Sequence, residues 1–177
     1  MFTTDRLVLR AFRDDDLDHL LALRNDPRVV TSLSAEPVVP RPPNYKIFLK
    51  ELAENSTIGF TITIKETGQF MGQCSIKATE PQKNRDALFG ISMYPDFWGK
   101  GYGREATKFT IDYAFKALGL QRVSLMVSAE NTRAISLYEK LGFSVEGRKR
   151  RANWVNGHWE DTLSMGVLQE EWAALHA

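Results

Sequence analysis

The sequence contains little cysteine, no long hydrophobic run and almost no net charge, and each shortage excludes a class of protein. Cys74 is the one cysteine among 177 residues, so no disulfide can form within the chain and we expect a reducing, cytoplasmic location. No apolar stretch approaches the roughly 20 residues of a membrane span, and the N-terminus lacks an apolar signal core, so we expect no membrane partner. The 23 Lys and Arg balance 22 Asp and Glu. The basic run 148–151 falls on a predicted strand, where its charges alternate between faces, so we expect no nucleic-acid partner.

The remaining composition is that of an ordinary globular protein. Hydrophobic residues make up 43% of the chain and charged residues 25%, which is sufficient to bury a core without disulfides or metals. The sequence shows no internal repeat and no low-complexity tract. A length of 177 residues predicts one domain spanning residues 1–177.

Hydrophobic periodicity predicts strands and helices along most of the chain. Predicted strands cover residues 6–12, 58–65, 69–77, 87–94, 122–128, 143–153 and 159–167, and predicted helices cover 14–25, 45–55, 103–118 and 131–141. Pro27 is expected to end the first helix, and Asn156-Gly157 favours a tight turn between the last two strands. The four prolines within residues 34–43 predict a stiff loop that is either a spacer or a wall of a substrate cleft. The order of elements indicates an α/β fold in three layers, with a mixed sheet and a C-terminal β-hairpin.

A glycine-rich segment, residues 98–103, joins a predicted buried strand to the longest predicted helix. Its sequence is Trp-Gly-Lys-Gly-Tyr-Gly. The first turn of a helix carries amides without partners and a partial positive charge. Glycines let a phosphate approach the backbone, and Lys100 adds a positive charge. The segment therefore predicts a pyrophosphate site formed by the amides of residues 99–104.

Four interpretations of this segment compete. A Walker loop is excluded because Tyr94 stands where its first glycine belongs and Gly101 where its Ser or Thr belongs. A dinucleotide fingerprint, Gly-x-Gly-x-x-Ala, fits residues 101–106, with Glu130 as the ribose acid. The 47 residues after Glu130 (131–177) are too few for a doubly wound sheet, which argues against it. The other two interpretations are a coenzyme A pyrophosphate site and a joint without ligand.

A second motif follows one predicted strand later, at residues 131–143. It reads Asn-Thr-Arg-Ala-Ile-Ser-Leu-Tyr-Glu-Lys-Leu-Gly-Phe, and it also suits a plain helix with Asn131 as N-cap and Gly142 beyond its end. Together the two segments resemble the GNAT superfamily of N-acetyltransferases, within it the branch of ribosomal-protein N-terminal and spermidine acetyltransferases. The family motifs are Gln/Arg-x-x-Gly-x-Gly/Ala and Asn-x-x-Ala-x-x-Leu-Tyr-x-x-Leu-Gly-Phe. Trp98 departs from the first motif, and every fixed position of the second matches.

The resemblance implies an enzyme that transfers acetyl from acetyl-CoA to an amine, without a metal. It implies a three-layer α/β/α domain whose central sheet splays open, so that the pantetheine arm pairs with an exposed strand. The implied cofactor-binding residues are Ile91, Ser92, Met93, Trp98, Gly99, Lys100, Gly101, Tyr102, Gly103, Arg104, Asn131 and Lys140. The Met93 amide would polarise the thioester carbonyl, Asn131 would bond the pantetheine arm, and Lys140 would reach the adenosine phosphate.

The chemistry explains why a tyrosine is wanted at position 138. Amine attack on a thioester expels a thiolate, and a phenol of pKa ~10 stays protonated at neutral pH and can protonate that leaving group. We therefore predict Tyr138 as the general acid of a direct transfer with no acetyl-enzyme. Cys74 is the only thiol, and with no His beside it in the sequence it is predicted to be a core residue.

The general base and the acceptor stay open. Relatives in this branch carry a Glu two residues before the position of Gly90, where this chain has Leu88. The remaining candidates for the base are Asp86, His158, Glu160 and Asp161. A second hypothesis is therefore an acyl-CoA sensor or scaffold without turnover. Under the first hypothesis, the acceptor is a protein N-terminal amine, a polyamine or another small amine, and the protein is a monomer or a homodimer.

Overall fold

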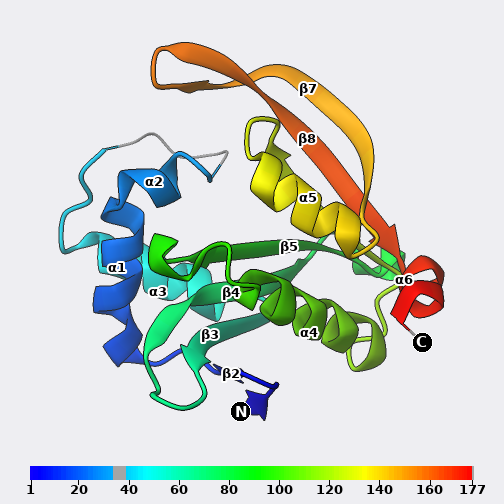
Figure 1. The fold of residues 1–177 in the computed structure, drawn as a ribbon, viewed down its shortest axis with the longest axis horizontal. Helices are drawn as coiled ribbons and strands as arrows, with labels where there is room; N and C mark the ends of the chain where they lie inside the picture. Colours follow the sequence, from blue (N-terminus) through cyan, green and yellow to red (C-terminus); the bar gives the residue numbers. More distant parts are fainter. Residues whose placement is uncertain (34–38, 177) are drawn as a thin grey trace.

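A computed structural model of the chain describes residues 1–33 and 39–176 (Figure 1). Within these residues, one eight-stranded sheet has the order β1-β2-β3-β4-β5-β6-β8-β7. The strands are β1 (Phe2–Thr3), β2 (Leu7–Arg10), β3 (Ile58–Ile64), β4 (Phe70–Ala78), β5 (Asp86–Met93), β6 (Arg122–Ser128), β7 (Ser144–Val155) and β8 (His158–Leu168). Neighbouring strands are antiparallel except β5 and β6, which are parallel. The predicted mixed α/β sheet is thus confirmed.

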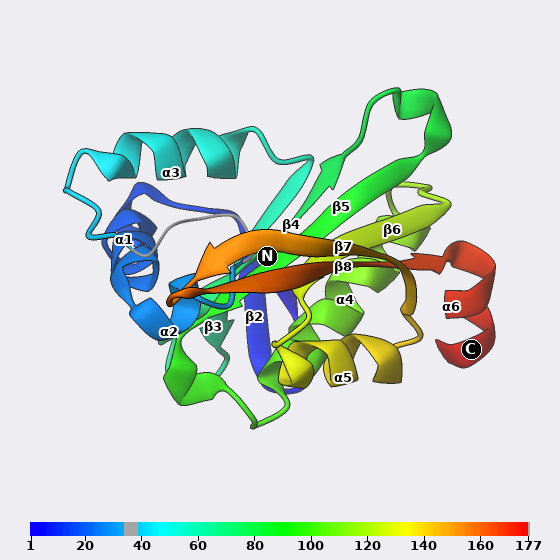
Figure 2. The ribbon, with the colours of Figure 1, turned by 90° about the horizontal axis from the view of Figure 1, so that it is seen from above.

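The helices form layers on both sides of this sheet. They are α1 (Leu17–Asn25), α2 (Pro27–Val30), α3 (Tyr45–Glu54), α4 (Tyr102–Lys116), α5 (Thr132–Lys140) and α6 (Gln169–His176). Figure 2 shows α3 on one side of the sheet and α4 and α5 on the other. Short 3-10 helices precede α1 (Asp14–Asp16), β5 (Gln82–Asn84) and α4 (Pro95–Phe97). Helices on both sides of one sheet form the predicted three-layer arrangement.

The central sheet opens between β5 and β6. Their register pairs only 86–88 with 122–124, although both strands continue beyond this point. Past Leu88 and Ser124, β5 stays bonded to β4 and β6 stays bonded to β8, so the two facing edges separate. This separation is the predicted splay, and it leaves the backbone groups along 89–93 that face β6 without a strand partner on that side.

Two apolar clusters hold the layers together. The larger one joins the sheet to α4, α5 and α6, through residues such as Ile111, Leu141 and Trp172. The smaller one lies under α1, α2 and α3 and includes Leu20, Leu23, Val29, Leu49 and Phe70. The helices α1, α2 and α3 therefore rest on a different apolar cluster from the one that contacts α4, α5 and α6.

A buried ion pair fixes the entry to α1. Asp16 is 3% exposed and accepts two hydrogen bonds from Arg10, at 2.8 and 2.7 Å. The Arg13 amide and Thr61 Oγ1 donate to the same carboxylate, each at 2.9 Å. Burial raises the pKa of Asp16, but these four bonds outweigh it and hold the pKa below its ordinary value.

Several predicted boundaries need correction. Pro27 ends α1 but also begins α2, where it occupies the first turn while Asp26 caps the helix by accepting from the Arg28 amide. The predicted loop after β4 contains a 3-10 turn, Gln82–Asn84. The terminal helix α6 was not predicted, because β8 passes directly into it without a turn signal. Of the predicted proline-rich loop 34–43, residues 34–38 lie outside the described part of the chain.

Candidate active site

A cleft of about 590 Å³ lies where β5 and β6 separate, between the start of α4 and the inner face of α5. Eleven of the residues predicted from sequence line it: Ile91, Ser92, Met93, Trp98, Gly99, Gly101, Gly103, Arg104, Asn131, Tyr138 and Lys140. A volume of this size suits an organic cofactor. The two sequence motifs therefore meet at one site.

The glycine segment presents the first turn of α4 to this cleft. Gly99 and Gly101 have φ of +73° and +82°, a backbone region that side chains disfavour. Gly101 is the N-cap, and no side chain caps the helix. The amides of 102–104 point out of the helix start without intrahelical partners, as at any helix N-terminus. This end of the cleft can therefore accept a phosphate, with Arg104 and Lys140 adding positive charge from its lining.

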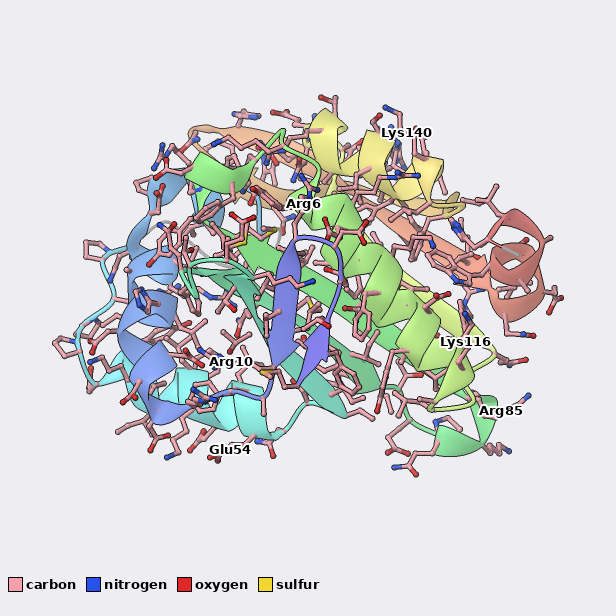
Figure 3. All side chains as sticks on the ribbon, turned by 60° about the horizontal axis from the view of Figure 1, so that its bottom comes forward. Arg6, Arg10, Glu54, Arg85, Lys116 and Lys140 are labelled. Atoms are coloured by element: carbon pink, nitrogen blue, oxygen red, sulfur yellow. The ribbon has the colours of Figure 1, made fainter. Side chains whose placement is uncertain are left out.

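Lys100 and Tyr102 lie outside the lining of the cleft. The Tyr102 ring packs under the Arg6 guanidinium, 4.4 Å from its centroid, and edge-on against Phe97. The side chain of Arg6, labelled in Figure 3, also donates to the Lys100 carbonyl at 3.0 Å and to Glu105 at 2.8 Å. Tyr102 therefore braces the loop from outside, and cofactor contacts from these two residues remain predictions.

Helix α5 contributes the opposite wall. Asn131 Oδ1 accepts from the Ala134 amide at 3.2 Å, so this side chain is the N-cap, and its amide nitrogen remains for a ligand. Arg133 stacks over the Trp98 ring at 3.8 Å. The Trp98 indole donates to the Met93 carbonyl at 3.0 Å. Trp98 thus ties β5 to α5 across the cleft, a role that the usual Gln or Arg of the family motif would not perform in this way.

Tyr138 is the buried titratable group of the cleft. Its side chain is held by Phe89 and Phe143, with ring centroids at 6.4 and 5.8 Å, and the residue is 8% exposed. Burial raises the pKa of the phenol to about 12. No hydrogen bond joins the phenol to another described residue, so its hydroxyl is available to a ligand in the cleft.

A second, smaller cavity of about 140 Å³ adjoins the cleft under α3. Both cavities share Arg24, Leu33, Gly90, Ile91 and Ser92 in their linings. The small cavity is otherwise lined by Phe12, Leu52, Ala53, Ser56, Gly59, Phe60, Thr61, Gln73, Cys74 and Ser75. It reaches β5 at the point where the sheet opens, on the way to the cleft.

The four candidates for the general base line neither cavity. Asp86 accepts from Ser124 Oγ at the closed end of the splay, and Asp161 accepts from Arg148 and the Arg151 amide. His158 and Glu160 lie with Glu130 in a group whose ligand atoms are within 4.8 Å of one another. Glu160 accepts from Ser128 Oγ at 2.5 Å and His158 bonds Glu130 at 3.1 Å, so these groups satisfy one another without a cation.

Sequence reasoning missed part of the lining. Arg24 comes from α1, Leu33 from the segment after α2, Phe97 from the turn before α4, and Arg133 from a variable position of the second motif. Arg133 had a signal, because it follows the N-cap by two residues on the helix that carries Tyr138. Arg24 had none, since only the tertiary fold brings α1 to β5.

Comparison with known proteins agrees with this geometry. Residues 6–144 match the acetyltransferase (GNAT) domain family. An uncharacterized N-acetyltransferase p20 from Bacillus licheniformis is 32% identical over 173 residues, covering 96% of this chain and 97% of that protein. A spermidine N(1)-acetyltransferase from Vibrio cholerae is 28% identical over 167 residues, covering 94% and 95%. A crystal structure of spermidine N-acetyltransferase from Vibrio cholerae with CoA and spermine superposes with a TM-score of 0.84 at 26% identity, covering 96% and 99%.

The fold and the cleft together define an acyltransferase. The chain belongs to the GNAT acetyltransferase family and is an acetyl-CoA-dependent N-acetyltransferase. The dinucleotide interpretation is wrong, because β5 and β6 form the only parallel pair of the described sheet. Among the described residues, no helix is both long and apolar enough to cross a membrane.

Proposed function

We propose that this enzyme transfers acetyl directly from acetyl-CoA to a small primary amine, with Tyr138 as the general acid. The observation that carries the proposal is the buried phenol in the cleft, beside strand edges that have separated. Acetyl-CoA supplies an acyl group already activated as a thioester. The phosphate-facing amides of 102–104 and the cations Arg104, Arg133 and Lys140 fit its pyrophosphate end. The open edge of β5 fits its amide-bearing arm.

In this transfer the protein donates one proton to the leaving sulfur and stabilises the negative charge that develops on the carbonyl oxygen. The acceptor nitrogen bonds to the thioester carbonyl carbon, the carbon–sulfur bond breaks, and the departing sulfur takes the Tyr138 proton. The proton left on nitrogen then passes through water to the phenolate, which restores the enzyme. The amide of Met93 donates to the carbonyl oxygen as negative charge develops there, a role supported by its place on the open edge of β5. A pKa of about 12 keeps Tyr138 protonated until the attacking nitrogen becomes cationic and lowers that pKa.

The acceptor comes from comparison and from the site. The similarity to spermidine N-acetyltransferase from Vibrio cholerae, in sequence and in structure, supports a small amine as substrate. A cavity of about 140 Å³ beside β5 supports entry of the amine from the α3 side of the sheet, opposite α5. A protein N-terminal amine presented by a short flexible end fits the same cavity. The enzyme works as a monomer or a homodimer.

The test compares two tyrosine variants in calorimetry and in thiol release. Tyr138→Phe should lower turnover by roughly 10²-fold or more while coenzyme A binding stays unchanged, because only proton donation is lost. Tyr113→Phe is the matched control. Tyr113 lies on α4 outside the cleft, and its ring packs against the rings of Phe2 and Phe60. Unchanged turnover in Tyr138→Phe would refute the acid role. Wild-type protein that binds coenzyme A but acetylates no amine would instead support a sensor.

A further inference from the structure

Strand β5 presents the backbone of Met93 to the open side of the splayed sheet. The Tyr94 amide donates to the Met71 carbonyl at 2.8 Å, so these two residues form a hydrogen-bonded pair between β5 and β4. The neighbouring pair, Gly72 with Met93, is therefore a non-hydrogen-bonded one. Both the N–H and the C=O of Met93 thus point away from β4, toward the edge from which β6 has separated.

The two backbone groups of Met93 place different demands on a ligand. They lie side by side, as in any extended residue, so a neighbouring strand would offer an acceptor to the N–H and a donor to the C=O. A thioester carbonyl offers only an acceptor. Its oxygen, bound to the Met93 N–H, would lie beside an unpaired Met93 carbonyl oxygen, and two partial negative charges repel each other. This repulsion would grow as the thioester oxygen becomes an oxyanion.

The Trp98 side chain supplies the missing donor. Its indole N–H donates to the Met93 carbonyl at 3.0 Å. The Arg133 guanidinium covers the Trp98 ring at 3.8 Å from its centroid, and the Trp98 amide donates to the Pro95 carbonyl at 3.0 Å. The partly buried ring also packs against both apolar clusters. The indole is therefore held in the position from which it bonds the Met93 carbonyl.

Contacts from β4 fix the same part of β5 from the opposite side. A Cβ at Gly72 would lie 2.1 Å from the Ser92 carbonyl oxygen and 2.7 Å from the Met93 Cα. Only glycine therefore lets β4 approach the peptide unit that carries the Met93 N–H. The next peptide unit is held at its N–H by the Met71 carbonyl and at its C=O by the Trp98 indole. The direction of the Met93 N–H is thus set by both of its neighbouring peptide units.

We propose that Trp98 is a positioning residue for acetyl transfer. Because its indole occupies the Met93 carbonyl, Met93 offers only its N–H to the cofactor, and this position selects a hydrogen-bond acceptor such as the thioester oxygen. The same bond excludes a shifted register in which an amide N–H of the pantetheine arm would pair with Met93. This inference rests on the proposed function and deepens it by naming the residue that aligns the acyl group.

Removing the indole N–H should affect the transfer step more than cofactor binding. Loss of a direct donor to an oxyanion lowers kcat by about 10²- to 10³-fold. Trp98 acts through Met93, so we expect Trp98→Phe to lower kcat by about tenfold. Affinity for coenzyme A should fall by about threefold at most, because Phe keeps a ring beneath the Arg133 guanidinium and free coenzyme A has no acyl carbonyl to align.

The first measurement is thiol release from acetyl-CoA, with spermidine or alaninamide as acceptor, whichever the wild type acetylates faster. Trp172→Phe is the matched control, because Trp172 is 3% exposed, donates its indole N–H to Asp112 at 2.7 Å and lies outside the cleft lining. The control should keep the wild-type kcat. An equal loss of kcat in both variants, or no loss in Trp98→Phe, would overturn the inference. No release by the wild type with either amine would instead count against the proposed function.

A second measurement separates alignment from a purely structural effect and needs no acceptor. S-(2-oxopropyl)-coenzyme A, labelled with ¹³C at its ketone, carries a carbonyl near the acyl position but cannot transfer it. Relative to an aprotic solvent, binding to the wild type should lower its infrared carbonyl stretching frequency, because the Met93 amide donates to it. Trp98→Phe should reverse part of this shift, whereas Trp172→Phe should not.

A further variant removes only the donor. Replacing Trp98 with 3-benzothienylalanine keeps the shape of the ring and its stack with Arg133, so it should reproduce the kcat loss and the carbonyl shift of Trp98→Phe. A carbonyl frequency equal to that of the wild type in both Trp98 variants would show that the indole N–H does not align the acyl group, whatever their turnover.

Discussion

The cleft region, built from β5, β6, α4 and α5, and the N-terminal helical region, built from α1 to α3, are stabilised in different ways. The cleft region rests on the larger apolar cluster, which runs through the sheet into α4 and α5. The helical region rests on a small cluster under α1 and α3. Its helices are joined further by surface ion pairs, Lys46 with Asp18 and Lys50 with Asp14, which solvent screens.

This contrast separates the two substrates. The cleft region must hold one large cofactor, so its geometry comes from backbone conformation and a continuous core. Under the proposed function, the helical region bounds the cavity through which the amine enters, so substitutions there should change the acceptor without disturbing the cofactor site. The difference teaches that cofactor binding and acceptor choice should respond separately to substitution, and the following variants test this from the largest expected effect to the smallest.

Asp16→Asn should have the largest effect, and it should act on the helical region. Removing the charge leaves the partly buried Arg10 guanidinium without its ionic partner, which costs about 3 kcal/mol, the lower end of the range for breaking buried pairs. The measurement is urea unfolding of the variant, followed by coenzyme A titration under native conditions. Affinity for coenzyme A should stay within about twofold, because Asp16 does not line the cleft. A loss of coenzyme A affinity as large as the loss of stability would show that the two regions are energetically coupled.

The pH dependence of stability, compared between wild type and Asp16→Asn, tests whether the charge of Asp16 is responsible. Because the folded pKa of Asp16 is lowered, its stabilisation is present above its ordinary value of 3.8 and is lost as the pH falls through the lowered folded value. Asp16→Asn should therefore remove part of the wild-type loss of stability in acid. Asp18 lies two residues further along the chain in an exposed ion pair with Lys46, so Asp18→Asn should change little.

Most elements of both regions were predictable from the sequence, and their exact entries were not. The strands β2 to β8 and the helices α1, α3, α4 and α5 were predictable because their apolar spacing, caps and glycines are local signals. The entry to α1 was not, because the ion pair of Arg10 with Asp16 resembles an ordinary acidic helix start until β2 and β3 are folded together. The helix α6 has neither a breaker nor a cap before Gln169, so its residues looked like the end of a strand.

Gly101→Ala should have an intermediate effect, confined to the cleft region. A non-glycine residue at φ +82° costs roughly 1 to 2 kcal/mol, and the added Cβ would lie 3.2 Å from Arg6 Nη2. Gly68→Ala is the matched control, because Gly68 has φ +72° in the β3–β4 turn with no atom near its Cβ position. Thermal unfolding should show similar destabilisation in both. Calorimetry should show weaker coenzyme A binding only in Gly101→Ala. Equal binding in both variants would show that the glycine segment does not contribute to coenzyme A affinity.

The candidate site shows the same inequality as the fold. Gly101, Asn131 and Tyr138 lie in two short motifs, so residue type and spacing were enough to nominate them. The small cavity draws on Arg24, Gln73 and Gly90, which lie far apart in sequence and carry no motif. Its lining is assembled only once those segments are folded against one another, which is why this cavity could not be predicted from the sequence.

Arg133→Ala should have the smallest effect, and it sharpens the comparison within the cleft region. The guanidinium over Trp98 contributes about 0.5 to 1 kcal/mol as a cation–π contact at a partly exposed site. We expect a loss of about two- to fivefold in coenzyme A affinity. Arg133→Lys keeps the charge but loses the planar stack, so it should recover only part of that loss.

A double-mutant cycle with Trp98→Phe separates stacking from charge. If the stack is the link between the glycine segment and α5, the two substitutions should be non-additive by about 0.5 kcal/mol or more in coenzyme A affinity. Additive effects would mean that Arg133 acts only as a charge toward phosphate. The glycine segment and α5 would then bind the cofactor independently of each other. The apolar core and the hydrogen bond from Trp98 to the Met93 carbonyl would be the contacts that hold the cleft region together.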